Sequence, residues 1–206
     1  MIKLSIIITS YNKGQYTKKL LDELHKQLTN ECEVIFVNDN STDDTLNIIK
    51  EHPITSHQNF VLINNETNQW VSTARNQGIE LSRGQYLTFI DGDDYPLDNY
   101  IQTLLLYTKE QCDVIVYDYQ CCSDHPDNDL SLIEKGYNMM CWSRLYKKDF
   151  LDKNNIRFDD KWKHIGYGED GDFNEKVTSV PNAIIVDKKD IIYSYRWGVE
   201  NSLSNQ

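Results

Sequence analysis

Short runs of β-branched and other apolar residues alternate with stretches of helical periodicity along the first 120 residues. The apolar runs predict buried strands at residues 4–8, 33–37, 60–63, 86–90 and 113–117. Apolar positions three and four residues apart predict helices at residues 15–28, 46–49, 71–78 and 97–105. This alternation is typical of an α/β protein whose mainly parallel sheet is covered by helices on both faces.

The rest of the chain is less regular. It contains a polar loop at residues 123–129, an aromatic segment at 137–146, an acid-rich loop at 166–172 and strand-like runs at 183–186 and 191–195. The polar loop is interpreted as a linker within the domain or a lid. A length of 206 residues without an internal repeat suits one domain, so we expect a single domain over residues 1–206.

Acidic residues outnumber basic ones, 32 to 21, and the net charge is −11. The averaged field repels phosphate backbones and anionic lipids, which argues against binding of nucleic acid or of a membrane surface through bulk charge. No apolar stretch approaches the roughly 20 residues that span a bilayer, and none forms a signal-peptide core. We therefore expect a soluble, cytoplasmic protein with no integral membrane segment, and the oligomeric state stays open.

The five cysteines do not suggest a disulfide framework. Cys121 and Cys122 are adjacent, and neighbouring Cα atoms lie about 3.8 Å apart, closer than the minimum of about 4.4 Å for a usual disulfide. No pair of cysteines or histidines has the spacing of zinc ligands. The thiols are predicted to be reduced and mostly buried.

Polar side chains follow three of the predicted strands at their carboxyl ends, where ligands collect in open α/β sheets. Thr9 and Tyr11 follow the first strand, Asp39 follows the second, and residues 91–94 follow the fourth. An aspartate such as Asp39 is, taken alone, more often a turn or capping residue. The sequence predicts a binding site at the edge where these clusters meet.

The run Asp91-Gly92-Asp93-Asp94 places three carboxylates within four residues. Two such charges about 5 Å apart repel by about 3 kcal/mol at an effective dielectric constant of about 20. A divalent cation would relieve this repulsion, and oxygen ligands select Mg²⁺ or Mn²⁺, which bridge to a diphosphate. The alternative is a solvated turn that caps the helix after Pro96.

Five blocks of residues follow one another in the order and spacing of a single family. They are Ile6-Ile7-Ile8-Thr9-Ser10-Tyr11-Asn12, Val37-Asn38-Asp39-Asn40-Ser41-Thr42-Asp43, Ala74-Arg75-Asn76-Gln77-Gly78, Phe89-Ile90-Asp91-Gly92-Asp93-Asp94 and Gly168-Glu169-Asp170. With these blocks, essentially the whole chain resembles the family 2 glycosyltransferases with the GT-A fold. The resemblance implies a GT-A-type Rossmann-like three-layer sandwich with a mainly parallel central sheet.

The resemblance also implies a reaction and its partners. The enzyme would move a sugar, with inversion, from a nucleoside-diphosphate sugar to a hydroxyl of a glycan or glycoconjugate, often in surface-polysaccharide synthesis. A UDP-sugar is the favoured donor, and a divalent metal, Mn²⁺ or Mg²⁺, is the implied cofactor. The donor half would occupy residues 1–120 and the acceptor half residues 121–206.

Residues that match the family's donor motifs inherit implied roles. Thr9 and Tyr11 would line the nucleoside pocket, with Tyr11 stacked on the base. Asp39 would accept a hydrogen bond from a uracil N–H. Arg75 would face the diphosphate, and its alternative is a surface ion pair.

The implied reaction centre consists of carboxylates. Asp91 would contact the ribose or the metal, Asp93 would be the direct metal ligand, and Asp170 would be the base. Direct displacement of a diphosphate needs one carboxylate to take the hydroxyl proton, and the Glu169-Asp170 pair beside Tyr167 and Phe173 suits a raised pKa. The alternative for Asp170 is a helix cap.

The chain departs from the family pattern at several positions. Thr9 stands where many members have proline, and Trp70 stands in place of a glycine-rich approach to the third helix. Trp70 either stacks on a substrate or closes the core. Trp142 and Arg196 lie in segments that resemble the acceptor side, where aromatic residues form a sugar-stacking platform or core.

Two other classes of function are alternatives. A sugar-1-phosphate nucleotidyltransferase has a similar fold but a glycine-rich basic loop after the first strand, where this chain has only Lys13 and Gly14. A non-catalytic nucleotide-sugar-binding protein would keep the pocket without turnover. Residues 166–171 fit G-x-G-x-x-G, but their carboxylates would face a pyrophosphate, which excludes a dinucleotide site.

Overall fold

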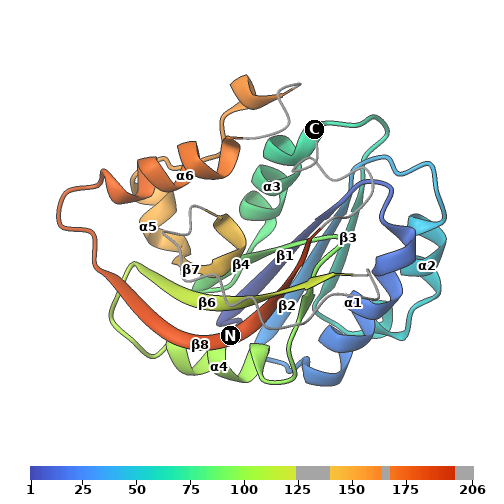
Figure 1. The fold of residues 1–206 in the computed structure, drawn as a ribbon, viewed down its shortest axis with the longest axis horizontal. Helices are drawn as coiled ribbons and strands as arrows, with labels where there is room; N and C mark the ends of the chain where they lie inside the picture. Colours follow the sequence, from blue (N-terminus) through green and yellow to red (C-terminus); the bar gives the residue numbers. More distant parts are fainter. Residues whose placement is uncertain (124–139, 164–167, 198–206) are drawn as a thin grey trace.

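The computed structural model describes residues 1–123, 140–163 and 168–197 of the chain (Figure 1). The strands are β1 (Leu4–Ser10), β2 (Cys32–Asn38), β3 (Phe60–Asn64), β4 (Tyr86–Asp91), β5 (Tyr95–Pro96), β6 (Val114–Ser123), β7 (Arg144–Lys147) and β8 (Ile185–Trp197). The helices are α1 (Gly14–Gln27), α2 (Thr45–Glu51), α3 (Trp70–Leu81), α4 (Tyr100–Tyr107), α5 (Lys148–Lys153) and α6 (Glu169–Thr178). Short 3₁₀ helices lie at Pro53–Ser56, Cys141–Ser143 and Asp160–Trp162.

Within these residues the strands form one eight-stranded sheet in the order β3-β2-β1-β4-β7-β6-β8-β5. β3, β2, β1 and β4 run parallel, as do β6 and β8, whereas β7 is antiparallel to β4 and β6. α1, α2 and α4 lie on one face, and α3, α5 and α6 on the other (Figure 1). The predicted α/β fold with a mainly parallel sheet and three layers is confirmed.

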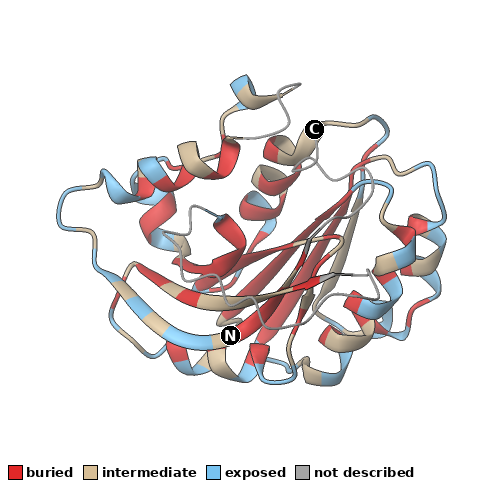
Figure 2. Cartoon of the chain, viewed as in Figure 1, coloured by how far each residue is buried: buried red, intermediate tan, exposed pale blue. Residues whose placement is uncertain are grey.

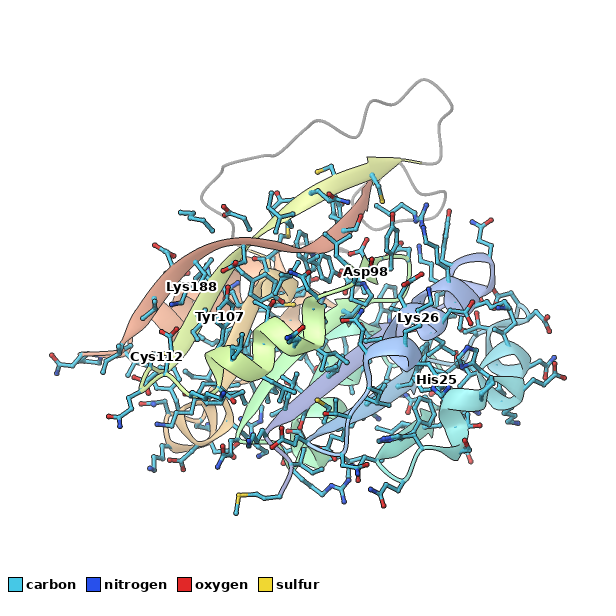
Figure 3. The ribbon with its side chains drawn as sticks, turned by 90° about the horizontal axis from the view of Figure 1, so that it is seen from below. His25, Lys26, Asp98, Tyr107, Cys112 and Lys188 are labelled. Carbon is cyan, nitrogen blue, oxygen red and sulfur yellow. The ribbon has the colours of Figure 1, made fainter. Side chains whose placement is uncertain are left out.

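Burial on both faces explains why the first strands could be predicted. Every residue of β1 and β2 is buried (Figure 2). A strand covered on both faces needs apolar residues on both, so it gives a continuous apolar run. α1 instead buries one side through Leu20, Leu21 and Leu24 and leaves His25 and Lys26 at the surface (Figure 3).

The second half of the sheet differs from its expected form. β7 overlaps the end of the segment 137–146, which the sequence marked only as aromatic, and it separates β4 from β6. The two strand-like runs at the C-terminal end are one long strand, β8, which follows β6 as far as Ser123 through two register shifts near Asp118. The polar loop predicted at 123–129 lies almost wholly outside the described residues. Within the described ranges, no helix is long and apolar enough to cross a membrane.

A buried acid fastens the amino-terminal edge of the sheet. Glu33 in β2 is fully buried and accepts hydrogen bonds from Ser5 Oγ at 2.7 Å and Arg83 Nε at 2.7 Å. Ser5 Oγ in turn accepts from the backbone N–H of Gly84 at 2.9 Å. These bonds join β1 and β2 to the turn between α3 and β4, which compensates for the desolvation of the carboxylate.

We expect Glu33→Gln to lower the free energy of unfolding by about 2 kcal/mol, because the amide would aim N–H donors at donors in a buried site. Urea denaturation followed by tryptophan fluorescence measures this loss. Glu80→Gln is the matched control, since Glu80 forms an exposed ion pair with Arg157. Equal midpoints for the two variants would contradict a fastening role for Glu33.

Candidate functional site

Two loops at the carboxyl ends of β1 and β2 are joined by side-chain hydrogen bonds. Asn12, whose φ is 53°, accepts a hydrogen bond on Oδ1 from the backbone N–H of Thr42 at 2.7 Å. Asp43 accepts from the backbone N–H of Gly14 at 2.8 Å and from that of Thr45 at 3.0 Å. One aspartate therefore accepts from the first backbone N–H of both α1 and α2, which holds the two loops in fixed relation.

These loops place the residues predicted to bind a nucleoside. Thr9 and Asp39 are buried at the strand ends, and Tyr11 on the adjoining loop is 44% exposed. Asp39 Oδ1 accepts hydrogen bonds from Asn65 Nδ2 at 2.7 Å and from the backbone N–H of Gln69 at 2.8 Å. Both hydrogen bonds end on Oδ1. Oδ2 takes part in neither of them and can accept a hydrogen bond from a ligand N–H.

Gly92 sits where β4 meets β1. A Cβ atom at this position would lie 2.6 Å from Ser10 Oγ and 2.7 Å from Ser10 Cβ. Only glycine lets the loop after β4 approach the end of β1 this closely. The close approach sets Asp91 and Asp93 beside the first loop of the site.

Each carboxylate of the 91–94 run has its own partners in the protein. The partners are Arg75 Nη2 for Asp91 at 2.9 Å, Lys13 Nζ for Asp93 at 2.7 Å, and Tyr193 OH and the Arg196 backbone N–H for Asp94 at 2.6 and 2.7 Å. Protein donors thus already compensate for the predicted crowding, so repulsion alone does not require a metal ion. Asp94 fastens the loop to β8 instead of facing a ligand.

Burial sets the protonation behaviour of this run. It raises the pKa of Asp93, and the ammonium of Lys13 acts in the opposite direction. It raises the pKa of Asp94 well above its usual range, with the charges of Asp93 and Asp91 adding to the effect. The charge of Lys13 therefore favours the ionised form of Asp93, against the effect of burial.

Arg75 is the centre of the site. It is 2% exposed, and its Nη1 donates to Asp170 Oδ1 at 2.5 Å and to Glu169 Oε1 at 3.2 Å, while Nη2 donates to Asp91. The surface-ion-pair alternative is therefore wrong for Arg75. One guanidinium of α3 draws together a carboxylate from β4 and two from α6.

Asp170 is held toward the site and away from its own helix end. The residue that caps α6 is Gly168, with φ of 101°, where a Cβ would lie 2.6 Å from the ring of Trp162. Asp170 accepts from Arg75 and, on Oδ2, from the backbone N–H of Cys141 at 3.1 Å. The helix-cap alternative for Asp170 is wrong.

The neighbouring Glu169 carries a perturbed pKa. Burial raises the pKa of Glu169, with Arg75 acting in the opposite direction and Asp170 adding to the rise. Phe173 is fully buried in the same helix, whereas Tyr167, the other aromatic neighbour named from the sequence, lies outside the described residues. The expectation of one raised pKa in this pair therefore applies to Glu169.

Trp142 belongs to the core. It is 2% exposed and stacks with Tyr193, at 4.7 Å between ring centroids, and with Tyr195, at 5.1 Å. A ring this deeply buried cannot serve as a platform for a sugar, so the core alternative holds for Trp142. The stack also positions Tyr193, whose hydroxyl donates to Asp94.

The sequence did not predict that three further residues contact the 91–94 run. Lys13, Tyr193 and Arg196 all contact the 91–94 run, and Arg196 Nε donates to the carbonyl oxygen of Asp93 at 2.9 Å. They lie far along the chain from that run, Tyr193 by 99 positions from Asp94 and Arg196 by 103 from Asp93, so no spacing links them to it. Trp70 is half-buried at the start of α3 with φ of 70°, a strained conformation for a bulky residue.

The carboxylates suit a metal ion whose coordination shell is completed by a bound ligand. In the described part of the chain, no cluster of three or more His, Cys, Asp or Glu side chains is arranged to hold a metal ion. Asp91 and Asp93 remain as two oxygen ligands, and Mg²⁺ is commonly bound by one or two carboxylates together with substrate phosphates and water. Asp91 and Asp93 therefore fit a metal that arrives with a diphosphate.

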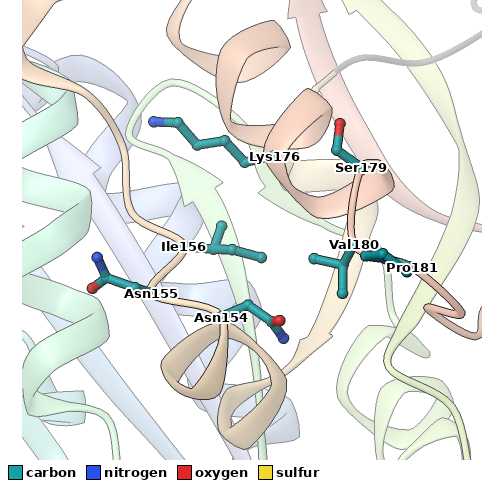
Figure 4. A pocket seen from close by; sticks show the side chains of 7 residues that line it. All are labelled: Asn154, Asn155, Ile156, Lys176, Ser179, Val180 and Pro181. Carbon is teal, nitrogen blue, oxygen red and sulfur yellow. The ribbon is translucent and has the colours of Figure 1, made fainter.

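A separate pocket of about 310 Å³ lies near the last turn of α6, away from these groups (Figure 4). Its lining includes Asn155, Ile156, Lys176 and Val180. Lys176 is already paired with Asp172 at 2.7 Å. The lining offers no group suited to catalysis, so this pocket is not the reaction site.

The sequence profile described as glycosyl transferase family 2 matches residues 5–166. Glycosyltransferase GlyA of Streptococcus pneumoniae serotype 4 is 30% identical over 94% of this chain, and the match covers 30% of GlyA. Putative glycosyltransferase EpsH of Bacillus subtilis is 27% identical over 75% of the chain, which covers 49% of EpsH. The chain thus spans between about a third and a half of the length of these curated relatives.

Solved structures share the fold. The crystal structure of Staphylococcus aureus TarS 1–349 in complex with UDP-GlcNAc matches all of this chain and 61% of its own, with a TM-score of 0.82 and 23% identity. Mannosyltransferase PcManGT from Pyrobaculum calidifontis, in complex with GDP-Man and Mn²⁺, covers 93% of this chain with a TM-score of 0.70 and 14% identity. This match covers 56% of PcManGT.

We expect Arg75→Met to lower the free energy of unfolding by about 3–5 kcal/mol at pH 7, because it leaves buried carboxylates without their cation. The pKa of Glu169, already raised, would rise further. A folded protein with such a carboxyl loses stability as pH increases through the raised pKa, because the charged form is disfavoured in the folded state. The cost should therefore be smaller at pH 5 than at pH 7. Urea denaturation at both pH values measures it.

Arg157→Met is the control for that measurement, since Arg157 pairs with Glu80 and Asp152 at a more exposed position. Its smaller cost should change little between pH 5 and pH 7. The same pH dependence in both variants would contradict the role given to Arg75.

Proposed function

Because the chain belongs to glycosyl transferase family 2, we propose that it transfers a sugar from a nucleoside-diphosphate sugar to a hydroxyl group of a glycan or glycoconjugate, with inversion. The observation that carries the proposal is the meeting of Asp91, Glu169 and Asp170 around the buried guanidinium of Arg75, with Asp93 paired to Lys13 in the same loop as Asp91. The donor half would lie in residues 1–120 and the acceptor half in residues 121–206.

A UDP-sugar is the donor that the first loops favour. Asp39 Oδ2 is an acceptor, which suits the N–H at position 3 of uracil, whereas neutral cytosine has no hydrogen there. Tyr11 is exposed beside Asp39 on the loop after β1 and offers a ring for stacking. Among structures with this fold, TarS binds UDP-GlcNAc and PcManGT binds GDP-Man, so a nucleotide sugar suits the fold and the base must be measured.

Asp93 and Asp91 would hold Mn²⁺ or Mg²⁺, and the ion would bind the oxygens of the leaving diphosphate and stabilise the charge that builds on them. Asp170 would accept the proton of the acceptor hydroxyl as its oxygen attacks the anomeric carbon. The bond from that carbon to the diphosphate breaks on the opposite side, which inverts the configuration. Arg75 and the Cys141 N–H each use one lone pair of Asp170, so each oxygen keeps another for the proton.

The alternatives fit less well. A nucleotidyltransferase needs a basic phosphate loop after β1, and Lys13, the cation at that place, contacts Asp93. A non-catalytic binding protein would not need Asp170 held between Arg75 and Cys141.

All five cysteines are free, which supports the cytoplasm, a reducing compartment, as the proposed location.

We expect thermal denaturation to identify the donor. A ligand that binds only the folded state, at about 100 times its Kd, stabilises that state by about 2.7 kcal/mol, so the matching nucleotide should raise Tm measurably. UDP with Mn²⁺ should raise Tm more than CDP or GDP with Mn²⁺. A larger rise with GDP would replace UDP as the donor nucleotide, and no rise with any nucleotide would contradict the proposed function.

We expect Asp170→Asn to lower kcat by about 10²- to 10⁴-fold, because the amide cannot take the hydroxyl proton, while UDP affinity stays near that of the unchanged protein. Steady-state transfer and isothermal titration with UDP measure the two quantities. Asp172→Asn is the matched control, since Asp172 lies in the same helix and pairs with Lys176. Full activity of Asp170→Asn would reject Asp170 as the base.

A further inference from the structure

Both carboxylates proposed to hold the metal already carry a cationic partner. Arg75 contacts Asp91, and Lys13 contacts Asp93. Each cation uses one carboxylate oxygen, Oδ1 of Asp91 and Oδ2 of Asp93. A metal ion that coordinates both oxygens of Asp93, or that binds where the ammonium of Lys13 now lies, must compete with that ammonium.

The two cations are held very differently. Arg75 is buried and bonded to three carboxylates on two elements, so its release would break all of them at once. The ammonium of Lys13 is paired with Asp93 alone among the ion pairs of the described residues, and both side chains are 13% exposed. Lys13 is therefore the cation that can leave.

The backbone of Lys13 is fixed while its side chain is long. Its N–H donates to Thr45 Oγ1 at 3.2 Å, and its carbonyl accepts from the backbone N–H groups of Tyr16 and Thr17 at 2.9 and 3.1 Å. A lysine head group on four methylene groups can change partner through rotation of its own bonds. A shift of the ammonium needs no rearrangement of the loop.

We propose that Lys13 is an exchangeable counter-ion of Asp93, which holds that carboxylate in the absence of metal and moves to the donor diphosphate when the divalent ion takes its place. This inference rests on the proposed function, because it needs a metal-bound diphosphate. Without the diphosphate, the metal must displace Lys13 and leave its ammonium without a partner. With the diphosphate bound, the displaced ammonium gains phosphate oxygens.

The exchange makes a thermodynamic prediction. Metal and nucleotide should each increase the affinity of the other, and the coupling must be equal in both directions. Replacing Lys13 with a neutral residue removes the competitor of the metal and one partner of the diphosphate. The metal alone should then bind more tightly, and the coupling should shrink.

The test measures Mn²⁺ binding directly, by the electron paramagnetic resonance signal of free Mn²⁺, with and without UDP. We expect Lys13→Met to bind Mn²⁺ alone about tenfold more tightly than the unchanged protein. The factor by which UDP increases Mn²⁺ affinity should be at least several-fold smaller in the variant. Lys19→Met is the control for net charge, since the Lys19 ammonium lies over the Tyr95 ring at 3.7 Å, and it should change neither quantity. Lys13→Gln is a second neutral replacement, and its Tm is compared with that of Lys13→Met. The variant with the lower Tm is set aside, so the binding test uses the better-folded protein.

Asp93→Asn separates this proposal from the proposed function. If Asp93→Asn loses Mn²⁺ binding in the presence of UDP while Lys13→Met binds Mn²⁺ as the unchanged protein does, the exchange is rejected and the metal site stands. If the unchanged protein binds no Mn²⁺ even with UDP, both are rejected. Equal changes in Lys13→Met and Lys19→Met would also reject the exchange, because net charge alone would then explain them.

Discussion

The site depends on one buried positive charge placed among carboxylates from distant parts of the chain. Arg75 on α3 bonds Asp91 at the end of β4 and Glu169 and Asp170 at the start of α6. None of these acids could be buried so close together without it. The proposed metal-binding carboxylate and the proposed base are thus held in a single electrostatic arrangement.

The sheet makes that arrangement possible. Parallel strands end at one edge, so the loops after β1, β2 and β4 converge there. β8 adds a support from the other half of the chain, since Tyr193 and Arg196 bind Asp94 and Arg196 also binds the carbonyl of Asp93. The C-terminal half therefore shapes the loop that would hold the donor.

The sequence predicted features that depend on local pattern. Fully buried strands such as β1 and β2 give continuous apolar runs, and the residue blocks identified the family that the match over residues 5–166 confirms. Contacts between residues far apart in the chain could not be predicted from the sequence. Neither the antiparallel β7 nor the pairing of Lys13 with Asp93 leaves a periodic signal, and Arg75, expected to face a diphosphate, contacts carboxylates 16 and 95 positions away.

A crystal structure of the protein with UDP and Mn²⁺ tests the central claim most directly. We expect the ion between Asp93 and the diphosphate, uracil against Tyr11 and Asp39, and Arg75 still bonded to Asp91 and Asp170. Nucleotide and ion bound elsewhere, with the 91–94 run unchanged and facing solvent, would contradict it.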